Sequence, residues 1–136
     1  MPETNPKYPE LLKAAKEAAQ RAYAPYSKFP VGAALLAEDG RVFIGCNVEN
    51  ASFGATICAE QTAIVKAVSE GCRKFVAVAV YCAETDDCWP CGICRQVLNE
   101  FAPELDVIVD CGNGSVTVIR LPDLLTRSFG PKDLPS

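Results

Sequence analysis

The sequence predicts an α/β protein in which a mixed five-stranded sheet lies between two layers of helices, as a three-layer α/β/α sandwich. Segments with helical spacing alternate along the chain with short apolar runs that are rich in β-branched residues. The run at 75–81 is apolar almost without interruption, which is typical of a strand covered on both faces. A length of 136 residues suits a single domain spanning 1–136.

The first part of the chain predicts a helix followed by a hairpin. After a loose arm at 1–8, small and apolar residues recur at helical spacing from Pro9 to about residue 24, and proline suits the first turn of a helix. The apolar runs at 31–37 and 41–48 are separated by a short segment with an Asp-Gly turn. We therefore expect these two runs to pair as antiparallel strands.

The second part predicts three helices and three strands, which completes the order αββαβαββα. Thr56 can cap the first of these helices and Gly71 can end it, while Pro90 suits the start of the next. The expected bounds are a helix at about 57–70, a strand at 74–82, a helix from 90 to about 101, strands at 106–110 and 116–120 around a Gly-Asn-Gly turn at 112–114, and a short helix from 122.

Composition and charge argue against several classes of function. The formal net charge is -4 and no basic stripe is visible, whereas nucleic-acid binding needs cations that neutralise phosphates. Nothing approaches the uninterrupted apolar length of a membrane span, and the polar, proline-bearing start is unlike a signal peptide. We expect a cytoplasmic protein that acts on a small molecule and binds neither nucleic acid nor a membrane.

Eight cysteines and the absence of histidine narrow the chemistry further. Without an imidazole, no Ser-His-Asp or Cys-His arrangement can form, so acid/base work falls to a carboxylate. A metal centre in this chain has to use sulfur and oxygen ligands. With no signal peptide in view, reduced thiols are expected. Five of them are interpreted as small packed side chains, namely Cys46, Cys72, Cys82, Cys88 and Cys111.

Three cysteines and one glutamate stand at the starts of two predicted helices. Cys91 and Cys94 are three residues apart directly after Pro90, so both sulfurs share one helix face. Cys58 stands upstream, with Glu60 two positions after it. Helix N-termini stabilise thiolates, which are the form that binds metal. Three thiolates beside a carboxylate that is not needed as a ligand indicate a catalytic zinc site with one open position.

Other interpretations of the cysteine pair are a redox-active site and a structural zinc site. Cys88 stands three residues before Cys91 and can supply the fourth ligand of a structural site, or compete for zinc. For Glu60 the alternative is an ordinary carboxylate at a helix start. The pairing of C-x-E with P-C-x-x-C nevertheless favours catalysis, because it is the three-cysteine form of the zinc deaminase signature.

Almost the whole chain resembles the small, homotetrameric, zinc-dependent cytidine deaminases. The matching segments follow the order and spacing of that family, and they are 23–29, 31–35, 45–51, the two cysteine motifs and 129–131. The resemblance implies a cytidine deaminase-like fold and a homotetramer whose active sites are shared between subunits. It also implies one Zn²⁺ per subunit, held by Cys58, Cys91 and Cys94.

The reaction that the resemblance implies is the hydrolytic deamination of cytidine and deoxycytidine to uridine and deoxyuridine, with release of ammonia, as in pyrimidine salvage. Hydroxide on the zinc would attack C4 of the cytosine ring. Glu60 would take the proton of the water, protonate N3 and deliver a proton to the departing amine.

Several residues are expected to bind the substrate. Asn47 and Glu49 alternate at the end of a predicted strand, so they face one side and suit ribose hydroxyls. The resemblance implies that they hold the sugar, that Phe29 packs on the pyrimidine, and that the backbone at Ala59 faces the polar edge of the ring. Taken alone, a phenylalanine such as Phe29 is more often a core residue than a ligand-binding one. The residues expected from neighbouring subunits are Ala51, Phe53 and Phe129.

Three positions depart from the family pattern. The family commonly has arginine where this chain has Gln61, which donates hydrogen bonds but carries no charge to offset three thiolates. We therefore expect Arg95, together with the two helix N-termini, to carry more of that charge. Trp89 replaces a smaller residue, where it can narrow or cover the pocket, and Phe53 replaces a frequent tyrosine and so removes one hydroxyl.

Two other functions are compatible with these residues. The same chemistry can act on a modified or antibiotic cytosine nucleoside, whereas a nucleotide is disfavoured because no glycine-rich or basic phosphate site is evident. A non-catalytic, zinc-stabilised interaction module belongs to a different class. In that case Glu60, Asn47 and Glu49 would be dispensable.

Overall fold

The computed structural model describes residues 5–85, 88–110 and 116–135. Within these ranges the strands form one sheet in the order β2-β1-β3-β4-β5. Strand β1 runs antiparallel to β2 and β3, β3 and β4 are parallel, and β4 and β5 are antiparallel, which confirms the predicted mixed sheet. The strands are β1 (Val31–Ala37), β2 (Val42–Cys46), β3 (Phe75–Cys82), β4 (Asp106–Asp110) and β5 (Val116–Arg120).

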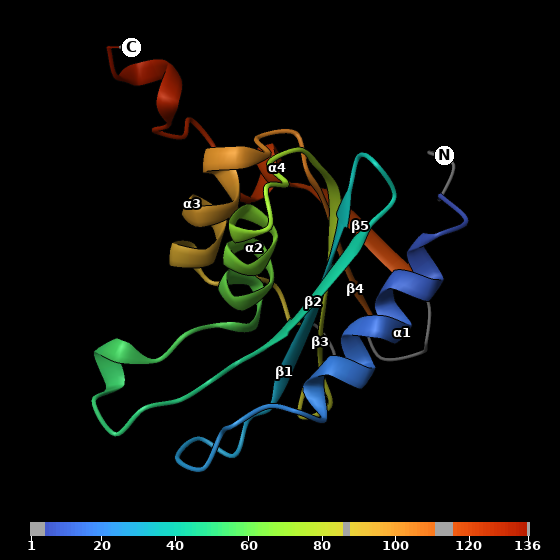
Figure 1. Ribbon diagram of the computed structural model, residues 1–136, viewed down its shortest axis with the longest axis vertical. Coiled ribbons are helices and arrows are strands. Elements are labelled where there is room, and N and C mark those ends of the chain that lie inside the picture. The colour runs from blue at the N-terminus through green and yellow to red at the C-terminus, as the bar shows by residue number, and fades with distance from the viewer. Residues whose placement is uncertain (1–4, 86–87, 111–115, 136) are drawn as a thin grey trace.

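Helices cover both faces of the sheet, so the described residues form the predicted three layers. Figure 1 shows α1 on one side of the sheet and α2 and α3 on the other. The parallel strands β3 and β4 are joined through α3, as a parallel pair requires. The helices are α1 (Tyr8–Ala19), α2 (Ala59–Ser69), α3 (Gly92–Phe101) and α4 (Leu121–Leu124), with two 3₁₀ turns, η1 (Phe53–Ala55) and η2 (Pro131–Asp133).

At two positions, a glycine in a strand lets a helix backbone lie directly against the sheet. A Cβ at Gly32 would lie 2.0 Å from the Ala15 carbonyl oxygen, so glycine there lets α1 close on β1. A Cβ at Gly45 would lie 2.6 Å from the Ala63 nitrogen and 2.7 Å from the Ala59 carbonyl oxygen. The start of α2 is therefore held directly against β2, because only glycine leaves enough room between them.

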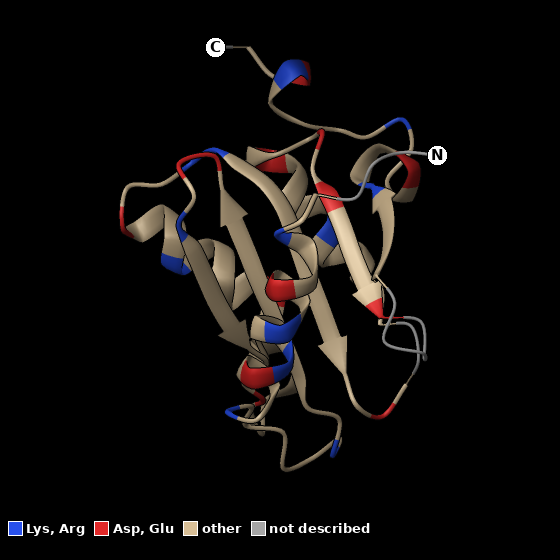
Figure 2. Ribbon diagram, turned by 90° about the vertical axis from the view of Figure 1, so that its right-hand side faces the viewer, with Lys and Arg blue, Asp and Glu red and all other residues tan. Residues whose placement is uncertain are grey.

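The outward face of α1 carries both signs of charge. Figure 2 shows lysine and glutamate positions interspersed along this helix rather than gathered into a basic stripe. Its inner face packs against the sheet through apolar side chains that include Leu11, Leu12 and Ala15, all of which are buried. No helix in the described ranges is long enough and apolar enough to cross a membrane.

Two boundaries differ from the sequence prediction. Helix α1 ends at Ala19 instead of near residue 24, because Tyr23 leaves the helix and pairs with the loop after β2. The Tyr23 amide donates to the Asn47 carbonyl oxygen at 3.0 Å, and the Tyr23 carbonyl accepts from the Glu49 amide at 2.8 Å. The N-cap of α2 is Cys58 and not the predicted Thr56.

The remaining boundaries agree closely with prediction. Gly71, with a φ of 89°, follows the C-cap of α2, as expected of a glycine that ends a helix. The predicted strands at 106–110 and 116–120 have the observed bounds of β4 and β5. The predicted turn at 112–114, the first part of the N-terminal arm and part of the acidic loop before the second cysteine motif lie outside the described residues.

Candidate active site

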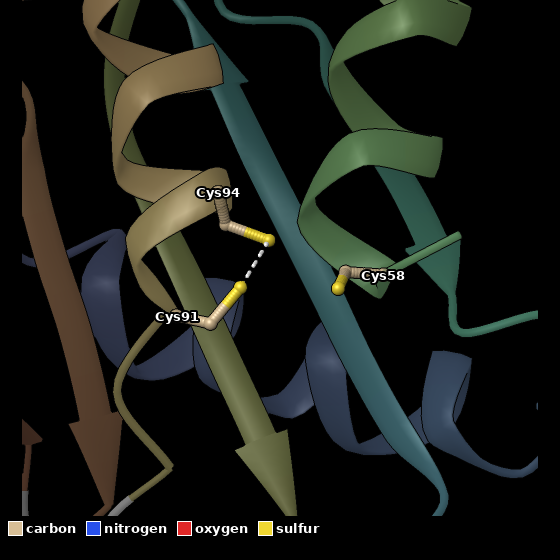
Figure 3. A group of neighbouring side chains, drawn as sticks. All are labelled: Cys58, Cys91 and Cys94. Carbon is tan, nitrogen blue, oxygen red and sulfur yellow. Dashed lines mark hydrogen bonds between the residues drawn. The ribbon is translucent and has the colours of Figure 1, made fainter. Parts of the chain in front are cut away.

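The starts of α2 and α3 bring three cysteine sulfurs together. Cys58 is the N-cap residue of α2, Cys91 is the N-cap residue of α3, and Cys94 lies in the first turn of α3. Figure 3 shows the three side chains turned toward one another across the space between the two helices. Their sulfurs all lie within 4.8 Å of one another, and those of Cys91 and Cys94 are 3.5 Å apart.

This group has the chemistry and dimensions of a zinc site. A tetrahedral zinc ion with Zn–S bonds of about 2.3 Å sets its sulfur ligands about 3.8 Å apart. The observed separations are therefore close to those that the ion requires. Thiolates are soft ligands that favour zinc, and three of them leave one position of the tetrahedron open. Among the described residues, the candidate metal ligands are these three, and Cys88 is not part of the group.

Hydrogen bonds within the group shift the pKa values of Cys58 and Cys94 in opposite directions. Hydrogen bonds from the Cys94 thiol and then from Cys91 lower the pKa of Cys58 to about 6, against the opposing effect of burial. The hydrogen bond to Cys58, and then burial, raise the pKa of Cys94. The thiol of Cys58 at the start of α2 thus ionises more readily than that of Cys94, and binding of a metal would release the protons that remain.

Glu60 lies beside this group in the first turn of α2 and is only 5% exposed. Burial raises the pKa of its carboxyl to about 7, and the neighbouring Cys58 charge acts in the same direction. A carboxyl that titrates near neutral pH is suited to accepting and returning a proton. A dication next to it would lower this pKa again, because it favours the carboxylate. The structure thus brings Glu60 to the cysteines as predicted from the C-x-E spacing.

The two residues expected to tune the thiolates have different contacts. The Gln61 side-chain nitrogen lies 3.7 Å from the Cys94 sulfur and donates a hydrogen bond to it. The Arg95 guanidinium donates to the Pro90 carbonyl oxygen at 2.7 Å and to the Leu124 carbonyl oxygen at 2.8 Å. Gln61 therefore contacts a sulfur directly, while Arg95 ties the segment before α3 to the end of α4. A charge effect of Arg95 on the thiolates stays a prediction.

The residues expected to hold the sugar lie next to the cysteine group. Val48 pairs with Ile57 through two backbone hydrogen bonds of 2.9 Å. Val48 separates Asn47 from Glu49, and Ile57 directly precedes Cys58. This pairing brings the segment after β2 against the segment that enters α2. The residues expected to hold the sugar therefore lie next to the cysteine group.

Asn47 and Glu49 both bind the connector between α1 and β1. The buried Asn47 amide donates to the Phe29 carbonyl oxygen at 3.0 Å and accepts from the Val31 amide at 2.9 Å. Glu49 accepts from the backbone amides of Tyr26 and Ser27 at 3.0 and 3.1 Å, and from the Ser27 hydroxyl. These hydrogen bonds, that of the Ser27 side chain above all, lower the pKa of Glu49.

The other predicted substrate residues divide into one buried position and three exposed ones. Ala59 is fully buried in the first turn of α2, between the cysteine and the glutamate of the first motif. Ala51 is exposed, and the rings of Phe53 and Phe129 are 75% and 59% exposed. Figure 1 shows that η1, which carries Phe53, and the C-terminal segment both project from the layers formed by sheet and helices.

Trp89 and Cys88 contact the core. Both are half-buried and pack against the apolar cluster on the α2 and α3 side of the sheet. Cys88 is thus packed, as expected of the cysteines outside the two motifs, and it is not part of the metal group. That Trp89 narrows or covers the pocket stays a prediction. Of the other cysteines, Cys72 and Cys82 are buried as expected and Cys46 is half-buried. Cys111 lies outside the described residues.

Three side chains with contacts at the site were not assigned a role from the sequence. Ser27 donates to Glu49, and the side-chain amides of Gln96 and Asn99 donate to the Phe129 carbonyl oxygen at 2.8 and 3.3 Å. Gln96 and Asn99 are three residues apart on α3, a spacing that places both on one face of the helix. Their partner lies about thirty residues further along the chain, so only the fold reveals the contact.

Comparison with known proteins adds an independent line of support. Residues 6–110 match the family model of the cytidine and deoxycytidylate deaminase zinc-binding region. The chain is 46% identical over 126 residues to a cytidine deaminase of Sporosarcina psychrophila, across 92% of this chain and 93% of that protein. It is 48% identical over 126 residues to a cytidine deaminase of Halalkalibacterium halodurans, across 91% and 95% of the two chains.

Solved structures agree with these sequence matches. A crystal structure of cytidine deaminase from Burkholderia pseudomallei is similar with a TM-score of 0.84 and 49% identity, over 88% of this chain and 97% of that one. The cytidine deaminase of Mycobacterium tuberculosis gives a TM-score of 0.81 and 41% identity, over 93% and 99% of the two chains. A zinc-binding family model that spans most of the chain, and relatives that match nearly end to end, place the chain in the cytidine and deoxycytidylate deaminase family.

Proposed function

We propose that this protein is a zinc-dependent cytidine deaminase, which converts cytidine and deoxycytidine to uridine and deoxyuridine with release of ammonia. The observation that carries the proposal is the group of three cysteine sulfurs within 4.8 Å, with the buried carboxyl of Glu60 on the same helix turn. Relatives that cover almost the whole chain are cytidine deaminases, which supports the same substrate class.

Cys58, Cys91 and Cys94 would hold the metal. When bound, zinc supplies a Lewis acid that makes water a good nucleophile near neutral pH. The helix N-termini of α2 and α3 stabilise the thiolates, and Gln61 donates a further hydrogen bond to the sulfur of Cys94. The protein thereby holds three negative ligands in place without a cationic side chain in direct hydrogen-bond contact among the described residues.

Glu60 would move the protons. Its carboxylate takes a proton from the attacking water and gives it to N3 of the cytosine ring while a C–O bond forms at C4. It then takes the proton of the new hydroxyl and gives it to the 4-amino group. The C4–N bond breaks, ammonia leaves, and one water and one cytidine have become one uridine and one ammonia.

Asn47, Glu49 and Phe29 would bind the nucleoside. The segment after β2 lies against the entry to α2, so a ribose held there would extend from the ring toward Glu49. Glu49 keeps an ionised carboxylate, a strong acceptor for a sugar hydroxyl. Phe29 is 37% exposed, so part of the residue is available for contact with a pyrimidine. The backbone at Ala59 lies between the first metal ligand and the proton carrier, where the polar edge of the base would be.

We further propose a homotetramer in which neighbouring subunits complete each site with Ala51, Phe53 and Phe129. The exposure of both phenyl rings on projecting segments supports this arrangement, because large apolar side chains that protrude in this way commonly contact another chain. The single domain spanning 1–136 and the cytoplasmic location stay predictions from the sequence.

The direct test is the loss of cytidine absorbance and the release of ammonia with purified, zinc-loaded protein. Chelation should abolish turnover, and zinc should restore it. A zinc-loaded protein that leaves both cytidine and deoxycytidine unchanged would contradict the proposal.

A further inference from the structure

The hydroxyl of Ser27 links Glu49 and Phe29, the two residues proposed to bind the sugar and the base of the nucleoside. It donates a hydrogen bond to the Glu49 carboxylate and accepts one from the Phe29 amide at 3.1 Å. A serine hydroxyl has one hydrogen to donate and can accept, so both contacts use its ordinary capacity. The same residue also donates its backbone amide to Glu49 at 3.1 Å. Ser27 is thus bound to the carboxylate through both its side chain and its backbone.

Both backbone polar groups of Phe29 are held by side chains. Its amide donates to the Ser27 hydroxyl, and its carbonyl accepts from the buried Asn47 side chain at 3.0 Å. Asn47 also accepts from the Val31 amide, at the first residue of β1. The position of the Phe29 ring therefore depends on two side chains, that of Ser27 inside the connector and that of Asn47 directly after β2.

The connector needs these contacts to keep its shape. Lys28, between Ser27 and Phe29, has a φ of 59°, in the left-handed region that residues with a Cβ adopt at a cost. The backbone around Lys28 is not part of a helix or strand. The Lys28 amide makes a turn hydrogen bond of 3.1 Å to the Ala24 carbonyl oxygen. Side-chain hydrogen bonds are the main means of holding such a segment in one conformation.

The contacts of Glu49 leave room for a ligand. One carboxylate oxygen accepts the two backbone amides, and the other accepts the Ser27 hydroxyl. Two carboxylate oxygens together offer about four acceptor positions, so one is left on the oxygen that Ser27 orients. That oxygen has the capacity to accept a sugar hydroxyl while the serine contact is kept.

We propose that Ser27 is a positioning residue, which orients the Glu49 carboxylate for the sugar hydroxyls and fixes Phe29 for the base, so that both are presented as one unit. The inference rests on the proposed nucleoside deamination and deepens it. It assigns a role to a residue that acts through Glu49 and Phe29 and does not itself contact the substrate. Loss of the hydroxyl should therefore weaken substrate binding more than it slows the chemical step.

The test compares Ser27→Ala and Ser27→Thr with a matched control, Ser69→Ala. Ser69 is an exposed serine whose hydroxyl donates to the Lys66 carbonyl oxygen at 2.8 Å, near the end of α2. Steady-state rates are measured with cytidine and with 2′,3′-dideoxycytidine, which lacks the sugar hydroxyls that Glu49 would bind. The zinc content and melting temperature of each variant are recorded, so that misfolding is recognised.

We expect Ser27→Ala to lower kcat/KM for cytidine by about tenfold, mainly through KM, the scale of one hydrogen bond to a charged group. The loss with 2′,3′-dideoxycytidine should be about threefold, because only the contact through Phe29 remains. Ser27→Thr keeps a hydroxyl and should recover most of the cytidine activity, and Ser69→Ala should match the wild type. An equal loss with both substrates, or no loss, would overturn the inference.

A double-mutant cycle with Glu49→Gln separates action through Glu49 from an independent effect. If Ser27 acts through Glu49, adding Ser27→Ala to Glu49→Gln should reduce kcat/KM for cytidine by clearly less than it does in the wild type. Fully multiplicative losses would refute that link. Wild-type protein that fails to deaminate cytidine would contradict the proposed function itself, whereas active wild type with an unaffected Ser27→Ala variant would contradict only this inference.

Discussion

The side-chain nitrogen of Gln61 donates a hydrogen bond to the sulfur of Cys94, at 3.7 Å. Cys94 is fully buried at the start of α3, and its sulfur also accepts a hydrogen bond from the Cys91 thiol at 3.5 Å. The Gln61 amide therefore offers this sulfur a hydrogen bond but no charge. The contact makes Gln61 the first residue to test around the metal ligands.

Replacement of Gln61 by methionine should weaken zinc retention. Methionine keeps the length of the side chain but removes the donor, and the loss of such a partner of a metal ligand typically costs 10- to 100-fold in affinity. Competition with a chromophoric chelator measures this directly. Gln20→Met is the matched control, because Gln20 is exposed at the end of α1. Equal zinc retention in the Gln61→Met variant and wild type would show that the hydrogen bond does not matter.

Replacement of Arg95 by methionine should lower the free energy of unfolding by about 2 kcal/mol, since two carbonyl groups lose their donor. The carbonyls belong to Pro90 and Leu124, which the guanidinium joins across the fold. Urea denaturation of the zinc-loaded protein measures the change. Unaltered stability would mean that water replaces both contacts without loss.

Replacement of Tyr8 by phenylalanine should destabilise the docking of α1. The Tyr8 hydroxyl donates to the Asp106 carboxylate at 2.6 Å, beneath the helix. Loss of this hydrogen bond should cost about 1–2 kcal/mol near neutral pH, by urea denaturation. Tyr23→Phe is the control, because the ring of Tyr23 is 56% exposed.

The destabilisation by Tyr8→Phe should depend on pH. Burial, and then the bond to Asp106, raise the pKa of Tyr8 above its ordinary value of 10.0. The phenol therefore ionises first in the unfolded chain, and the stability it contributes is present below about pH 10 and is lost as the pH rises further. The difference in unfolding free energy between wild type and variant should begin to shrink near pH 10 and keep shrinking as the pH rises above that value. A constant difference would contradict the assignment.

Mixed oligomers test whether Phe129 serves a neighbouring subunit. Glu60→Gln and Phe129→Ala should each be inactive or nearly so alone, whereas oligomers assembled from both should regain activity. In a random equal mixture, about one site in four combines an intact Glu60 with a neighbour's intact Phe129. Activity that stays at the level of the separate variants would show that Phe129 does not act between chains.

Much of the architecture follows from local patterns. The strands at 106–110 and 116–120 agree with their apolar runs, and the cysteine ligands follow from the spacing of residues at two helix starts. A cysteine at an N-cap lies at the positive end of the helix dipole, which favours the thiolate that a metal needs, so motif and boundary coincide. The same local chemistry made Thr56 a plausible cap, but Cys58 occupies that position because Ile57 is still paired with Val48.

The parts that the sequence does not reveal depend on contacts between distant segments. Helix α1 ends early because Tyr23 pairs with the loop after β2. Arg95 donates a hydrogen bond to the Leu124 carbonyl oxygen, which lies about thirty residues further along the chain. Gln96 and Asn99 likewise donate to the distant Phe129 carbonyl oxygen. In the sequence, nothing distinguishes Ser27 from any other serine in a loop. Its role depends on Glu49, which only the hairpin brings close.

The most direct test of the account is the Glu60→Gln variant, assayed for zinc and for turnover in the same sample. Glutamine is close in size to glutamate but cannot carry the proton between water, N3 and the departing amine. The account predicts one zinc per chain, as in the wild type, and cytidine turnover reduced by about 10²- to 10⁴-fold, the scale of general acid–base catalysis. A zinc-loaded Glu60→Gln protein that deaminates cytidine at the wild-type rate would contradict it.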